Sequence, residues 1–105
     1  MRLGDDGELV PVCAGLRSPA GVTAAPWGQV FYTDNQGEWC GASKLSLLEP
    51  GGFHGHPWGM ESARLPRSQV AYPGPLPDGA LMPLAARVVP GFALPAVWFP
   101  YDVMG

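Results

Sequence analysis

The turn Gly15-Leu-Arg-Ser-Pro-Ala-Gly21 carries one side chain that could bind a ligand through its charge, Arg17. An arginine guanidinium can hold a carboxylate or a phosphate through two parallel hydrogen bonds, so Arg17 is a candidate for binding an anionic group. The alternative is a structural arginine that donates hydrogen bonds to carbonyl groups of the loop. Pro19 and Gly21 are expected to shape the turn itself.

A second polar group follows the apolar run that ends at Thr33. Asp34, Asn35 and Glu38 carry the hard oxygen atoms that Ca²⁺ prefers, in numbers of about six to eight. One loop does not supply a full coordination shell, so an ion here would need further ligands. The alternative is an Asx turn, in which the Asp34 side chain accepts hydrogen bonds from the backbone that follows it.

Two histidines, His54 and His56, alternate with glycine in Gly52-Phe-His-Gly-His-Pro57. In an extended segment both imidazoles lie on the same side, which would suit a metal ion. Zinc needs three or four ligands, and no third ligand stands at a recognisable spacing. The spacing therefore favours a structural role for His56 in a glycine-rich turn.

Aromatic and sulfur-containing residues give further candidates. The four tryptophans, at positions 27, 39, 58 and 98, are expected to pack in the core or against a neighbouring sheet, with sugar stacking by Trp39 or Trp58 as the alternative. Cys13 and Cys40 have no metal-binding spacing and are expected to be two buried reduced thiols. A disulfide between them remains open, because spacing alone does not exclude it.

Short apolar runs separated by glycine and proline turns predict antiparallel all-β structure. With 15 Gly and 13 Pro in 105 residues, only one short helix is expected, at Met60–Leu65 before Pro66. An irregular loop is expected over residues 62–82. The predicted strands are Glu8–Cys13, Gly21–Ala25, Gln29–Thr33, Lys44–Leu48, Arg87–Val89 and Ala96–Phe99.

Composition excludes several classes of protein. The apolar fraction of 47% with a net charge of only −3 indicates a folded chain rather than a disordered one. Six scattered basic residues argue against a nucleic-acid partner. No run approaches the roughly 20 apolar residues of a transmembrane helix, and the N-terminus lacks the apolar region of a signal peptide.

Several motifs in a fixed order give the chain a family resemblance over roughly residues 5 to 105. The chain resembles the glucose/sorbosone dehydrogenase-like β-propellers, in particular their bacterial membrane-bound dehydrogenase branch. In the best-known members the first motif has His and Asn where Leu16 and Ser18 stand here. The motifs are Gly15-Leu-Arg-Ser-Pro-Ala-Gly21, Phe31-Tyr-Thr-Asp-Asn-Gln-Gly-Glu-Trp39, Ser43-Lys-Leu45, Pro50-Gly-Gly-Phe-His-Gly-His-Pro57 and Pro95-Ala-Val-Trp-Phe-Pro-Tyr101.

The resemblance implies an architecture. A complete domain of this family is a six-bladed propeller, so 105 residues correspond to about one and a half blades and to a truncated chain. We expect a best-defined blade over residues 1–60, an irregular loop over 61–83 and the start of the next strands over 84–105.

The resemblance also implies a function, that of a periplasmic or secreted oxidoreductase acting on a sugar or alcohol. Pyrroloquinoline quinone and calcium would be its cofactors. Arg17 and Ser18 would then contact the quinone, and Asp34 and Asn35 the metal. Glu38, Trp39 and His56 are further candidates for the same rim of the propeller. The remaining blades of a full-length protein would be its structural partners.

A second class of function stays open, because propellers host many unrelated functions. A non-catalytic propeller that binds carbohydrate or protein partners would carry the same strands and turns. In either case the rim residues Arg17, Ser18, Asp34 and Asn35 are predicted to lie together at one end of the strands, where functional loops are usually found.

Overall fold

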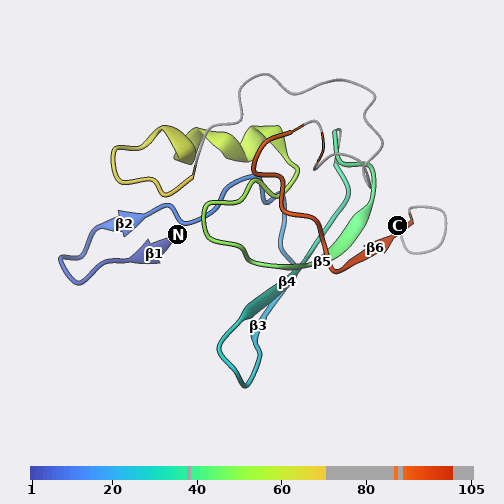
Figure 1. Ribbon diagram of the computed structural model, residues 1–105, viewed down its shortest axis with the longest axis horizontal. Helices are drawn as coiled ribbons and strands as arrows, with labels where there is room; N and C mark the ends of the chain where they lie inside the picture. The colour runs from blue at the N-terminus through green and yellow to red at the C-terminus, as the bar shows by residue number, and fades with distance from the viewer. Residues whose placement is uncertain (38, 71–86, 88, 101–105) are drawn as a thin grey trace.

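The computed structural model describes residues 1–37, 39–70, 87 and 89–100, and these form two antiparallel sheets. A two-stranded sheet pairs β1 (Arg2–Leu3) with β2 (Leu9–Val10). A four-stranded sheet has the order β3-β4-β5-β6. Its strands are β3 (Gly21–Ala24), β4 (Val30–Asp34), β5 (Ser43–Leu47) and β6 (Val97–Phe99). The first hairpin extends away from the larger sheet (Figure 1).

Turn chemistry explains how β3 and β4 pair. Gly28 has a φ of +96°, which favours glycine, and its N–H donates to the carbonyl of Ala25 at 2.8 Å. This tight turn sets the register in which Val22 lies opposite Tyr32. The strands themselves are rich in the β-branched and aromatic residues that favour extended backbone.

The fourth strand of the larger sheet comes from far along the chain. β6 pairs with β5, with Val97 opposite Leu45, although about half of the sequence separates them. Part of that connection is the 3-10 helix η1 (Pro57–Arg64), which begins with a proline in its first turn.

The apolar core lies where three chain segments meet beside the sheet. Parallel bridges join Ala14 to Phe53 and Phe53 to Phe92. The rings of Phe53 and Phe92 pack edge-to-face at 5.9 Å, and Trp39 packs against both of them. The buried members of this core are Ala14, Phe53, Met60, Val70, Val89 and Phe92.

The antiparallel all-β prediction is confirmed, and the strands predicted around β3, β4 and β5 agree with the structure to within one or two residues. The strand predicted at Glu8–Cys13 is shorter, because only Leu9 and Val10 pair, while the Pro11 carbonyl accepts from Gln69 instead. The strand predicted at residues 87–89 is wrong. Val89 begins a turn in which its carbonyl accepts from the N–H of Phe92, Arg87 is helical and residue 88 lies outside the described part.

The helix expected at Met60–Leu65 is a 3-10 helix that begins three residues earlier. The irregular loop predicted from residue 62 therefore overlaps this helix, and its residues 71–82 lie outside the described part. Trp27 and Trp58 are exposed on the surface rather than packed in the core, with 71% and 85% of their areas accessible. Whether the sheets belong to a propeller remains a prediction.

Candidate functional site

The Asp34 carboxylate organises the predicted rim. It lies at the end of β4 with only 2% of its area exposed. Its Oδ2 accepts the backbone N–H of Arg17 at 2.9 Å, and its Oδ1 accepts those of Ser18 at 2.7 Å and Asn35 at 3.1 Å. Hydrogen bonds to an ionised carboxylate are among the stronger ones in proteins. The carboxylate therefore fixes the backbone of the turn that carries Arg17.

A second set of backbone hydrogen bonds holds the same turn from the other side. The N–H of His54 donates to the carbonyl of Ala14 at 2.8 Å, and the N–H of His56 donates to that of Gly15 at 2.9 Å. The Arg17 side chain itself is exposed, and no hydrogen bond or ion pair joins its guanidinium to another residue of the described part. The turn is fixed in place, and the guanidinium is presented to solvent.

His56 lies beside Asp34 and is buried. Its Nε2 is 3.8 Å from Asp34 Oδ2 and has no hydrogen-bond partner among the described residues. Burial lowers the pKa of His56 to about 4, and the positive charges of Lys44 and Arg17 act in the same direction. His56 is therefore neutral at physiological pH, and a hydrogen bond to Asp34 at this distance is too long to be strong.

Beneath the histidines, one face of the β4–β5 pair is polar and yet buried. Asp34 lies opposite Lys44 and Tyr32 lies opposite Ser46, so all four side chains share one face of the sheet. None of the four has more than 2% of its area exposed. The Gly52–His56 segment covers this face.

His54 joins the covering segment to the polar face. Its Nδ1 shares a 2.6 Å hydrogen bond with the Tyr32 hydroxyl, and the two rings meet edge-to-face at 5.3 Å. The Lys44 ammonium donates to the backbone carbonyl of His54. Burial raises the pKa of Tyr32 and lowers that of Lys44. Burial, together with the nearby charge of Lys44, lowers the pKa of His54 to about 4.

Both cysteines are free thiols, as expected, and the alternative of a disulfide between them is not formed. Cys40 is buried near Lys44, and Cys13 is half-buried. Burial raises the pKa of each thiol, which keeps both in the less reactive protonated form.

The structure brings Arg17, Ser18, Asp34 and Asn35 together at the end of β4, with His56 next to them. Trp39 does not join them, because its ring packs against Phe53 and Phe92 in the core. Glu38 lies outside the described residues.

The sequence did not single out Tyr32, Lys44 and Ser46 as part of this region. A signal for them exists in the two-residue alternation of Ser43-Lys-Leu-Ser-Leu, which places Lys44 and Ser46 on one face of a strand. The alternation does not say which of the two faces is covered.

The donors at the rim do not fit the expected calcium ion. Both Asp34 oxygens already accept backbone N–H groups, and Asn35 is exposed. Over the described ranges, no group of three or more His, Cys, Asp or Glu side chains is placed to hold a metal. The exposed Arg17 guanidinium, by contrast, suits a carboxylate group of the expected quinone.

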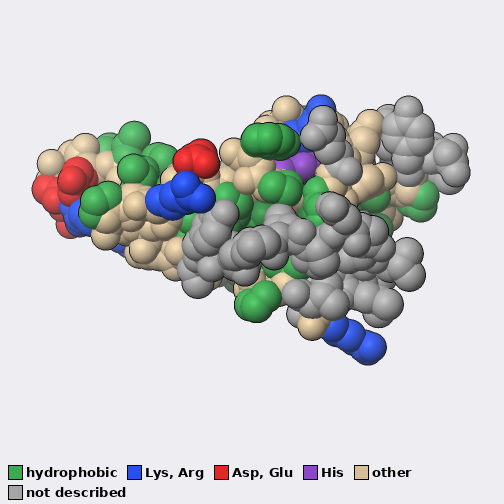
Figure 2. Space-filling view, turned by 90° about the horizontal axis from the view of Figure 1, so that it is seen from above, with side chains coloured by type: hydrophobic (Ala, Val, Ile, Leu, Met, Phe, Trp, Pro, Cys, Tyr) green, Lys and Arg blue, Asp and Glu red, His purple; other side chains and the backbone are tan. Residues whose placement is uncertain are grey.

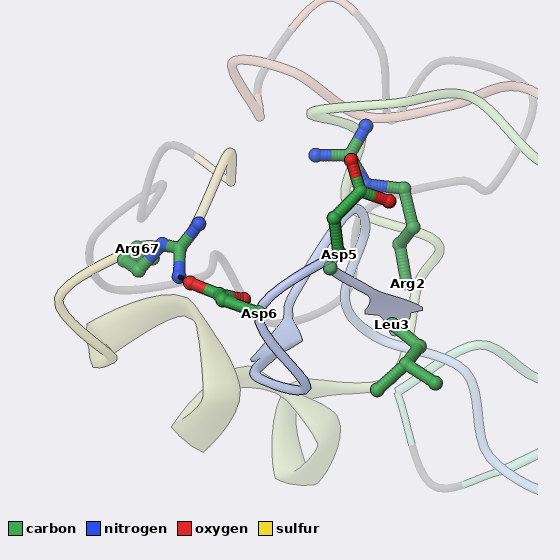
Figure 3. Close-up of a pocket in the computed structure, with 6 residues that line it drawn as sticks. Arg2, Leu3, Asp5, Asp6 and Arg67 are labelled. Carbon is green, nitrogen blue, oxygen red and sulfur yellow. Dashed lines mark hydrogen bonds and ion pairs between the residues drawn. The ribbon is translucent and has the colours of Figure 1, made fainter.

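An open pocket of about 380 Å³ lies at the N-terminal hairpin, and none of the predicted site residues lines it. Arg67 binds Asp6 at 2.8 Å and also binds Glu8, and Figure 3 shows Arg67 and Asp6 pointing toward one another. These side chains are about half exposed, so the ion pairs hold the hairpin only weakly.

The acidic side chains visible in Figure 2 lie toward this end of the molecule, and only a small area of histidine shows among the other side chains.

Comparison with known proteins gives no relative. No family model matches the chain, and neither a curated protein nor a solved structure is similar to it at a significant level. Within the described residues, no helix has both the length and the apolar character needed to cross a membrane.

Proposed function

We propose that this chain is part of a β-propeller oxidoreductase that acts on a sugar or alcohol, with Arg17 as a ligand-binding residue at its rim. The observation that carries the proposal is the contrast between the two parts of Arg17. Its backbone N–H is bound by the buried Asp34 carboxylate, whereas its guanidinium is exposed without an ion pair in the described part of the chain.

Such an arrangement favours ligand binding because a preorganised backbone lowers the entropy lost when a side chain engages its ligand. Pyrroloquinoline quinone carries carboxylate groups, and Arg17 would bind one of them, with the exposed Ser18 hydroxyl next to it. The quinone would supply the oxidising chemistry. Asp34 would position the Arg17 turn rather than bind calcium. The proposal includes a periplasmic or secreted location for the complete protein.

The order of the larger sheet is compatible with a propeller blade. Blades are four-stranded antiparallel sheets, and β3-β4-β5-β6 is a sheet of that kind. The loops at the end of β4 would then face the ligand, as functional loops on rigid scaffolds commonly do.

Quinone binding to the full-length protein tests the proposal. Arg17→Ala should weaken the binding of pyrroloquinoline quinone by about 10- to 100-fold, the value of a charge-assisted hydrogen-bonded pair. Isothermal titration gives the affinity, and dye reduction with added sugar and calcium gives the turnover. Arg87→Ala, which removes another exposed arginine, is the matched control. Equal quinone affinity of the Arg17→Ala variant and the wild type would remove Arg17 from the site.

A carbohydrate-binding propeller without catalysis is the second candidate. The exposed rings of Trp27 and Trp58 favour it, because sugars stack on exposed aromatic faces. Sugar binding without quinone binding, lost in Trp58→Ala and retained in Arg17→Ala, would support this candidate over the oxidoreductase.

A further inference from the structure

On the buried polar face of the β4–β5 pair, the side chains that can carry a positive charge outnumber the carboxylates. Lys44, His54 and His56 meet there, and the carboxylate present among the described groups, Asp34, already accepts three backbone N–H groups. Proton uptake by a histidine would therefore place a second positive charge beside the Lys44 ammonium without a free counter-ion. An uncompensated buried charge is strongly unfavourable.

Every element packed around His54 contributes a titratable or polar group to this balance. The Lys44 ammonium lies against the backbone carbonyl of His54 itself, and the Tyr32 hydroxyl lies against its ring. The one carboxylate among these neighbours, Asp34, is held by three backbone N–H groups and is not available to form an ion pair with His54. The groups that face it are Tyr32 and Asp34 of β4, Lys44 and Ser46 of β5, and the backbone carbonyl of Glu49, while Cys40 lies against Gly55 of the same segment as His56. Asp34 and the Glu49 carbonyl favour the charged imidazole, but burial and Lys44 oppose it more strongly.

The segment that carries His54 also joins separate parts of the chain. Its backbone forms hydrogen bonds with Ala14 and Gly15 on one side and with Gly91 and Ala93 on the other. The N–H of Phe53 donates to the carbonyl of Gly91 at 2.8 Å, and the carbonyl of Phe53 accepts from Ala93 at 2.8 Å. By contrast, the pairing of β3 with β4 and of β4 with β5 does not involve this segment.

We infer that the Gly52–His56 segment opens locally at acidic pH, because protonation of the His54 imidazole detaches it from the sheet. This opening frees the Arg17 turn, while β3, β4 and β5 stay paired. The inference does not rest on the proposed function, since it concerns only how this turn is held.

The direction of the pH dependence follows from linkage. In the closed segment the pKa of His54 is about 4, and in the open segment it returns toward the ordinary value of 6.5. The closed form is therefore fully favoured above pH 6.5, and this stabilisation is lost as the pH falls from 6.5 toward 4. For His54 alone, these values make the open form about 20-fold more populated at pH 5 than at pH 7.

Hydrogen exchange followed by mass spectrometry, at pH 7 and pH 5 and corrected for the intrinsic rates, measures this opening. We expect the amides of His54, His56 and Ala93 to lose about 20-fold or more in protection, and those of β4 to lose much less. Equal loss of protection in both regions would show global unfolding and would overturn the inference. Unchanged protection of the segment at pH 5 would overturn it as well.

Two variants assign the effect to one imidazole, because the chain has only two histidines. His54→Asn keeps an acceptor near the Tyr32 hydroxyl but does not titrate, so it should reduce the ratio of opening between pH 5 and pH 7 by about 20-fold. His56→Asn is the matched control and should keep the His54 contribution. The inference fails if His54→Asn has the wild-type ratio.

An NMR titration of the wild type keeps the inference testable even if His54→Asn does not fold. The His54 imidazole should titrate only as the amides of its segment lose protection. Titration near pH 6.5 with full protection of these amides would show that the closed segment tolerates the charge.

Discussion

The Asp34 carboxylate is surrounded by backbone N–H groups, and this decides what its oxygen atoms can do. A strand-end aspartate in a polar loop has the composition of a metal site, which is why the sequence pointed to calcium. In the structure its oxygens are bound by the N–H groups of residues 17, 18 and 35. The local hydrogen bond of Asp34 comes from the N–H of the next residue, Asn35, whereas an Asx turn would use the N–H two residues on, so these bonds are not those of an Asx turn.

Removal of this carboxylate should destabilise the fold strongly. Asp34→Ala leaves three N–H groups without their acceptor, and we expect a loss of about 3 kcal/mol in the free energy of unfolding. Asp34→Asn keeps one acceptor oxygen and should lose about half as much. Urea unfolding followed by tryptophan fluorescence gives these values.

Asp5→Ala is the control for the Asp34 variants, because Asp5 is an exposed aspartate. It should change stability by less than about 0.5 kcal/mol. If Asp34→Ala were as stable as Asp5→Ala, the carboxylate would not hold the turn.

Close approach of backbone segments explains the glycines around the site. Gly15 has a φ of +83°, and a Cβ there would lie 2.6 Å from the Phe53 ring and 3.0 Å from the backbone nitrogen of His54. The parallel contact between the Arg17 turn and the Gly52–His56 segment therefore requires glycine at this position.

A series of three alanine substitutions separates conformational strain from steric overlap. Gly15→Ala combines both and should lose more than about 3 kcal/mol in the free energy of unfolding. Gly28→Ala has the unfavourable φ but no atom within 4 Å of its Cβ, so about 1 kcal/mol is expected. Gly41→Ala has neither and should be neutral.

Chemical denaturation of the three variants measures their losses in the free energy of unfolding and so gives the order of the three effects. The close packing of the two segments would be contradicted if Gly15→Ala lost no more stability than Gly28→Ala.

The elements were predictable from sequence where the signal is local. Turn residues and apolar runs gave β3, β4 and β5 to within one or two residues, and the same pattern brought Arg17 and Asp34 to one end of the strands. The polar face was not predictable in this way. Lys44 is completely buried because a segment about ten residues away in the chain covers it, and alternation within β5 carries no information about that cover.

Errors arose where tertiary contacts override local preference. The Trp39 ring packs against Phe53 and Phe92, as the core prediction has it, so Trp39 does not occupy its alternative position at the rim. Val89 has the β propensity of a strand residue, yet its carbonyl closes a turn with Phe92.

The described part of the chain is flat and elongated, with extents of 45 × 34 × 20 Å. The thin hairpin β1–β2 contributes little core, and its cross-strand pair Leu3 and Leu9 is more than 60% exposed. Two-stranded hairpins are marginally stable on their own. Stability therefore depends on the region where the Gly52–His56 segment covers the sheet.

The complete burial of Lys44 has a chemical consequence for the whole molecule, because it is the only lysine in the sequence. An amine-reactive ester should acylate the N-terminus of the folded chain and leave the Lys44 amine unmodified. In urea both amines should react, and mass spectrometry resolves the two products. Equal acylation of Lys44 with and without urea would show that its amine is accessible in the folded state. If Lys44 is protected in the folded state, the rate of its acylation without urea measures how often the folded molecule opens and exposes the Lys44 amine.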